Sequence, residues 1–86
     1  MEQTDSRVAV IGIIIQDLDA ASDLNEIIHE YRDIVLGRMG IPYRQKNIHI
    51  MSIAVDAPAT AINALTGKIG RLKGVTVKTA YAPLPD

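Results

Sequence analysis

Two segments of this chain are apolar on both of their alternating faces, and they constrain the fold more than any other feature. Residues 7–16 read Arg-Val-Ala-Val-Ile-Gly-Ile-Ile-Ile-Gln, and residues 48–55 read Ile-His-Ile-Met-Ser-Ile-Ala-Val. Both segments are rich in β-branched residues, and successive side chains of a strand point to opposite faces. A strand that is apolar on both faces is typical of the interior of a sheet. We therefore expect both segments to be central strands.

Two helical stripes and two weaker strands accompany these segments. Apolar residues recur at helical spacing in 20–31, where Asp19 or Ser22 offers an N-terminal cap. A second stripe follows Pro58, which suits the first turn of a helix, and Gly74 suits a helix end. The expected order is strand 7–16, helix 20–31, strand 34–40, polar turn 42–47, strand 48–55, a helix carrying Ile62, Leu65, Ile69 and Leu72, and strand 75–81.

The order strand-helix-strand-strand-helix-strand predicts an α+β fold, the ferredoxin-like βαββαβ sandwich. It has a four-stranded antiparallel sheet with two helices on one face. Right-handed crossovers place the first and third strands in the centre of that sheet, and these are the two that are apolar on both sides. At 86 residues the chain is expected to hold one domain over 7–82, with a flexible N-terminus 1–6 and a C-terminal tail 83–86.

Two helices cover only one face of such a sheet. The alternating sets of the first strand are Ala9, Ile11, Ile13 and Ile15, against Val8, Val10, Gly12 and Ile14. Whichever set faces the helices, the sheet exposes about five large aliphatic side chains, on the order of 10 kcal/mol of forgone burial. A patch of this size usually marks an interface. We expect a homo-oligomer joined through the open sheet face or through strand edges; the alternative is a monomer with an apolar sheet face.

Composition excludes several classes of function. Nine Lys and Arg balance ten Asp and Glu, and the central strands carry no Phe, Trp or Tyr, which argues against direct nucleic-acid binding. The longest apolar run, residues 8–15, is too short to span a bilayer, so no membrane association is expected. The absence of cysteine excludes a thiol nucleophile and makes the cytoplasm the default location. His29 and His49 lie on different elements, so we expect no metal site and no cofactor.

Residues 37–44, Gly-Arg-Met-Gly-Ile-Pro-Tyr-Arg, are the most distinctive segment. Arginines beside glycines can approach an anion closely, so Arg38, Gly40, Tyr43 and Arg44 are the candidate anion-binding residues. The other interpretation is an edge strand with a glycine bulge and solvated arginines. The segment holds no nucleophile or general base, so we expect no catalytic residues. An acylphosphatase-like enzyme is a remote alternative, since acylphosphatases carry their phosphate loop after the first strand.

Five blocks of the sequence resemble the iron-only hydrogenase system regulator family. They are residues 7–15, 25–31, 37–44, 63–68 and 74–81, and the block 37–44 is the most specific. The resemblance implies an ACT-like fold, similar to the effector domain of the nickel-responsive repressor. The turn 17–20 has neither the Pro nor the Gly of amino-acid-binding ACT domains, and the chain lacks the cysteine ligand of the nickel repressor.

The expected function is therefore a non-enzymatic, oligomeric regulatory or sensing domain linked to the iron-only hydrogenase system. It would bind a small anionic effector or a partner protein at subunit interfaces near Arg38, Tyr43 and Arg44. Without a DNA-binding segment, it would act through a hydrogenase-maturation protein or a transcription factor. The alternative is a structural assembly factor for hydrogenase maturation that binds no small ligand.

Overall fold

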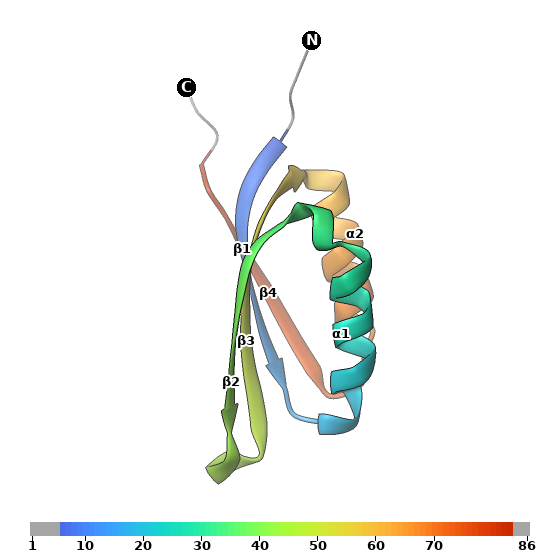
Figure 1. Cartoon of the computed structure of the whole chain (residues 1–86), viewed down its shortest axis with the longest axis vertical. Coiled ribbons are helices and arrows are strands. Elements are labelled where there is room, and N and C mark those ends of the chain that lie inside the picture. The colour runs from blue at the N-terminus through green and yellow to red at the C-terminus, as the bar shows by residue number, and fades with distance from the viewer. Residues whose placement is uncertain (1–5, 84–86) are drawn as a thin grey trace.

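The computed structural model describes residues 6–83 and shows one antiparallel sheet with two helices packed on one side of it (Figure 1). The elements are β1 (Ser6–Ile15), η1 (Leu18–Ala20), α1 (Ala21–Glu30), η2 (Arg32–Ile34), β2 (Val35–Tyr43), η3 (Arg44–Lys46), β3 (Ile48–Pro58), α2 (Ala59–Gly70) and β4 (Val75–Tyr81). The strand order is β2-β3-β1-β4. The ferredoxin-like fold class and the central positions of β1 and β3 are thus confirmed.

The ends of the chain limit what can be compared with the expected domain bounds. Residues 1–5 and 84–86, which belong to the expected flanking segments, lie outside the described residues. Ser6, which was placed in the flexible N-terminus, is instead the first residue of β1 and pairs with Pro58 of β3. Within residues 6–83, no helix is long and apolar enough to cross a membrane.

The helices cover the face of β1 that carries alanine and isoleucine. Ala9, Ile11, Ile13 and Ile15 are buried, and so are Met51, Ile53, Val55 and Ala57 of β3. From the helices, Leu24, Ile28, Ile62, Leu65 and Ile69 complete the same core. The core is built almost entirely from aliphatic side chains, as expected of a chain without Phe or Trp.

The other sheet face is apolar and uncovered. Val8, Val10 and Ile14 of β1 remain 46%, 47% and 41% exposed, and Ile50 of β3 is 38% exposed. In the ladder, Ile50 lies between Ile14 and Ile41, and all three point to this side. We call it the open face. The structure thereby shows which of the two alternating sets of β1 faces the helices, a choice that the sequence alone did not decide.

The β2–β3 hairpin is longer than the sequence pattern predicts. The strand β2 continues through Pro42 to Tyr43, and the turn consists of η3 and the left-handed Asn47. Proline is tolerated here because β2 is an edge strand and needs no second partner. The register shifts between Val35 and Gly37, where a bulge was one interpretation of the glycines. At the other end β3 extends to Pro58, which precedes α2 rather than lying in its first turn.

The expected caps of the first helix are wrong. A short helix, η1, precedes α1, and the side chain of Asp17 accepts a hydrogen bond of 3.0 Å from the backbone nitrogen of Asp19. The N-cap of α1 is Ala20, which has no side-chain bond. The first free N–H groups of this segment belong to η1, so the cap lies at Asp17 and not at Asp19 or Ser22.

Gly74 joins the end of the α2 segment to the start of the sheet. Helix α2 ends at Gly70, earlier than expected, and Leu72 packs against the core from the following turn. Gly74 has φ +75°, and its carbonyl accepts hydrogen bonds from the backbone nitrogens of Gln16 and Asp17 at 2.7 and 3.2 Å. A Cβ at this position would collide with the Cβ of Asp17. Both the conformation and the close approach therefore require glycine.

We expect Gly74→Ala to lower the free energy of unfolding by about 2 kcal/mol or more, because alanine is strained at positive φ and also meets Asp17. Gly67→Ala is the matched control: this position in α2 has open space, and the exchange should stabilise by roughly 0.5–1 kcal/mol. Urea unfolding at a fixed chain concentration measures both. Equal midpoints for wild type and Gly74→Ala would contradict this account of the turn.

Candidate functional site

The candidate residues lie on the β2–β3 hairpin, whose tip extends past η1 and the start of α1 (Figure 1). The ladder pairs Tyr43 with Ile48 and Pro42 with His49, and η3 closes the turn. Because the tip protrudes, its side chains are exposed or half-buried, with no helix covering them. The tip is therefore open to solvent, and it lies next to η1, a segment distant in sequence.

The structure does not bring all four predicted residues together. Arg38 lies on the helix-facing side of β2, where its Nη2 donates to Oδ1 of Asn25 at 2.8 Å and lies 3.8 Å from Sδ of Met51. Tyr43 follows five residues later, and an odd spacing along a strand places its side chain on the opposite face. Arg44 begins η3 at the tip. Tyr43 and Arg44 thus form one group, and Arg38 is held elsewhere.

Gly40 has a steric role next to His49. Gly40 lies on the same side of the ladder as Arg38 and pairs with Met51. A Cβ at position 40 would lie 3.1 Å from Nε2 of His49, closer than an ordinary contact. Gly40 therefore leaves room for the imidazole at its observed position, and its contribution to the site is indirect.

Tyr43 and Arg44 line a pocket of about 220 Å³ at the hairpin tip. We call it the hairpin pocket; its lining residues are Leu18, Pro42, Tyr43, Arg44, Asn47, Ile48 and His49. Leucine, proline and isoleucine supply apolar walls, while the guanidinium, phenol, amide and imidazole supply polar groups. Arginine stays charged at all ordinary pH values, so it can neutralise and orient an anion but cannot act as a base. This combination suits a small organic anion with an apolar body.

His49 is the member of this pocket that sequence analysis did not assign to the site. Its alternation with isoleucines predicted a core or interface histidine, and the structure places it half-buried opposite Pro42. The signal that identifies it is the register: once the turn is known to be 44–47, His49 pairs with Pro42, next to Tyr43 in the sequence and on the side of Gly40. Imidazole can transfer protons near neutral pH. Among the residues that line this pocket, however, none is a serine or a carboxylate that would complete a catalytic pair.

The charge of the molecule is divided between the hairpin and the first helix. Residues 34–55 contain Arg38, Arg44 and Lys46 and no acidic residue. Residues 17–33 contain six acidic residues against the single basic Arg32. The near-zero net charge therefore conceals a positive hairpin and a negative helical side. A positive arm attracts anions over roughly the 8–10 Å of the Debye length at physiological salt.

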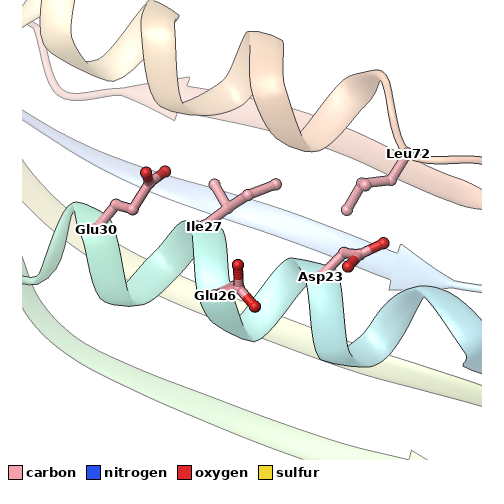
Figure 2. A pocket seen from close by; sticks show the side chains of 5 residues that line it. All are labelled: Asp23, Glu26, Ile27, Glu30 and Leu72. Carbon is pink, nitrogen blue, oxygen red and sulfur yellow. The ribbon is translucent and has the colours of Figure 1, made fainter.

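A second pocket, of about 280 Å³, lies between α1 and the turn after α2 (Figure 2). Its lining residues are Asp23, Glu26, Ile27, Glu30 and Leu72. Figure 2 shows the three carboxylates spaced along α1 without converging on one point. Within residues 6–83, no three His, Cys, Asp or Glu side chains are close enough together to hold a metal ion.

One carboxylate of this second pocket is in an ion pair. Glu30 lies 3.4 Å from Nζ of Lys68, whose ammonium lies 5.2 Å from the centre of the Tyr31 ring. Tyr31, by hydrogen bonding, and the charge of Glu30 raise the pKa of Lys68 above its ordinary value. Lys68 therefore remains charged and ties α2 to the end of α1. This pair has a structural role, so the hairpin pocket is the stronger candidate site.

Comparison with solved structures places the fold among known proteins. The uncharacterized protein TM1266 from Thermotoga maritima has a TM-score of 0.87 and 30% identity, over 91% of this chain and 99% of its own. A formyltetrahydrofolate deformylase from Pseudomonas putida KT2440 has a TM-score of 0.64 and 15% identity, over 88% of this chain and 29% of its own. The second likeness shows the fold alone. No curated protein sequence matches the chain.

The family assignment agrees with the resemblance seen in the sequence. The model of the TM1266-like family, described as "Iron-only hydrogenase system regulator, putative", matches residues 7–79. This range covers every helix and strand of the domain except the first residue of β1 and the last two of β4. The chain belongs to the TM1266-like family of iron-only hydrogenase system regulators.

Proposed function

We propose that this chain is a non-enzymatic regulatory domain of the iron-only hydrogenase system, acting in the cytoplasm as a homo-oligomer that binds a small anionic effector in the hairpin pocket. Family membership supports the regulatory class. The observation that carries the effector site is the pocket itself, which is lined by Tyr43, Arg44 and His49 at the tip of a hairpin without acidic residues. The homo-oligomer rests on the uncovered aliphatic side chains of the open face.

The pocket favours an organic anion over a bare inorganic ion. The Arg44 guanidinium offers charge-assisted hydrogen bonds, and the Tyr43 hydroxyl and the Asn47 amide add further donors. Leu18 and Ile48 form apolar walls that would bury the body of the ligand. Arg38 does not line this pocket and is bound to Asn25, so the proposal rests on Tyr43 and Arg44.

The surroundings argue against an acylphosphatase-like reaction. Such an enzyme holds its phosphate in a loop between the first strand and the first helix. Here that connection carries Asp17 and Asp19, and Asp17 already caps η1. Two carboxylates at this position repel a phosphate. The hairpin pocket borders this acidic connection through Leu18, and none of its lining residues is a serine or a carboxylate.

The pocket also lies between two segments of the fold, and a ligand bound there would contact both. Leu18 belongs to the connection between β1 and α1, whereas Arg44 belongs to the hairpin tip. Tyr43 pairs with Ile48 on the side of the open face. A ligand held between these segments would fix the hairpin relative to η1 and would change the edge of the open face. Effector binding and association of copies would thereby influence one another.

The binding test uses benzoate and phenyl phosphate as probes, with two-dimensional NMR titration of the uniformly labelled protein. We expect both probes to shift the amide signals of residues 43–49, and Arg44→Gln to weaken binding roughly tenfold through loss of a charge-assisted contact. Arg38→Gln is the matched control, because it removes the same charge from the same hairpin but outside the pocket.

Two results would contradict the proposed effector site. An equal loss of affinity in both arginine variants would mean that the hairpin attracts anions only through its overall charge. Unshifted signals at 43–49 with both probes at millimolar concentration would instead favour the assembly factor that binds no small ligand. Either outcome leaves the family membership of the chain intact.

A further inference from the structure

A glycine occupies the centre of the sheet without an evident reason within a single copy. Gly12 lies in β1, between Ser52 of β3 and Lys78 of β4. A glycine in the middle of a strand weakens it, since it loses more conformational entropy and offers no side chain to pack. Among the glycines of residues 6–83, Gly74 alone has a positive φ. Gly12 therefore has an ordinary strand conformation that any residue can adopt. A Cβ there would lie 3.8 Å from the Lys78 carbonyl oxygen, an ordinary contact.

The missing side chain produces a hollow on the open face. A pocket of about 320 Å³ lies over Gly12, with Ile14, Ile50 and Thr76 among its walls and Ser52 and Lys78 beside it. Exposed Val8, Val10, Met39 and Ile41 surround it on the same face. Glycine inside a strand is typical of a place that another backbone or ligand approaches closely. The hollow therefore points to a second surface that packs on the sheet at Gly12.

The charges of the open face favour a second copy of the chain as that surface. Among the described residues of this face, Asp56 of β3 is the acidic one and Lys78 of β4 is the basic one. Asp56 lies level with Val8, and Lys78 lies level with Gly12, on opposite sides of β1. They are separated by roughly 13 Å along the strands and roughly 10 Å across them. The two side chains are too far apart to pair within one copy, yet each is the complement of the other.

A two-fold axis satisfies both charges at once. Val10 lies midway between Asp56 and Lys78, because it pairs with Ala54 on one side and Ala80 on the other. An axis that passes near Val10 places Lys78 of each copy over Asp56 of the other, and symmetric dimers repeat each contact twice in this way. This axis lies in the interface plane, perpendicular to the line from Asp56 to Lys78, which runs roughly 36° from the strands. The strands of the two sheets then cross at roughly 70°, close to the orthogonal arrangement of packed sheets.

The open face is large enough for a specific dimer. Four strands at roughly 4.8 Å spacing and side chains from Ile48 to Asp56 at about 3.3 Å per residue give a face of roughly 19 by 26 Å. Two such faces in full overlap bury roughly 1,000 Å² in total, the size at which specific interfaces begin. The contact would also cover the exposed aliphatic side chains on both copies.

The geometry points to a face-to-face dimer in which Gly12 lets the two sheets approach and Lys78 of each copy pairs with Asp56 of the other. This interface deepens the homo-oligomer of the proposed function and rests on it. It assigns the contact to the open face rather than to the strand edges. It also places the hairpin pocket, through Tyr43 and Ile48, beside the edge of the interface.

Sedimentation velocity of the purified chain across micromolar concentrations tests this interface. We expect wild type to dimerise, and Gly12→Leu and Lys78→Glu each to raise the dissociation constant at least tenfold while circular dichroism stays native. The double variant Lys78→Glu with Asp56→Lys exchanges the two charges and should restore most of the affinity. Lys73→Glu, an exposed residue of the turn before β4, is the matched control and should not change it.

A second measurement does not depend on these variants remaining folded. The chain has no cysteine, so Val10→Cys supplies a single thiol near the axis. A bismaleimide of roughly 10 Å, the spacing of packed sheets, should cross-link Val10→Cys into dimers and should leave Ser22→Cys on the exposed side of α1 monomeric.

The outcomes separate this inference from the proposed function. A monomeric wild type would overturn the homo-oligomer itself, and with it this interface. A wild type that associates equally well with Gly12→Leu and Lys78→Glu, and that does not cross-link through Val10→Cys, would retain the oligomer but overturn its placement on the open face. Loss of affinity in Lys78→Glu without recovery in the double variant would overturn the reciprocal ion pair.

Discussion

The structure depends on one imbalance. The two central strands of the sheet are apolar on both faces, but the helices cover only one face. Burial of Ile11, Ile13 and Ile53 against α1 and α2 stabilises the single copy. Val10, Ile14 and Ile50 on the other side contribute nothing comparable until something covers them. At roughly 1.5–3 kcal/mol for each fully buried aliphatic side chain, the uncovered face holds a large part of the stability that a small domain can reach.

The functional features follow from this imbalance and from the topology. The hairpin of β2 and β3 carries Arg44 and Lys46 at its tip, and this tip forms the hairpin pocket with Leu18 of η1. Tyr43 belongs both to that pocket and to the side of the open face. A copy packed on the sheet and an anion bound at the tip would therefore lie next to each other. Under the proposed function, such proximity would give a physical route from effector binding to assembly.

Much of the fold follows from residue patterns, whereas the site depends on register. Two-sided apolar segments, helical stripes and the βαββαβ order were sufficient for the topology, since only one arrangement buries those strands centrally. The same patterns ended β2 too early, because Pro42 signals a turn unless the strand is known to lie at the edge. That error left His49 without its partner Pro42. It also grouped Arg38 with Arg44, although β2 directs Arg38 toward Asn25. Side-chain direction on a strand alternates with each residue, so a segment of sequence alone cannot show which arginines converge.

Solvent exposure of the isoleucine methyl groups tests the central claim most directly. With a soluble gadolinium chelate in the solution, the δ1 methyl signals of Ile14 and Ile50 should be as protected as those of buried Ile11 and Ile53 at concentrations where the copies associate. On dilution, their relaxation should rise toward that expected from the exposure of a single copy. Strong relaxation of Ile14 and Ile50 at every concentration would show that the open face stays in water and would contradict the account.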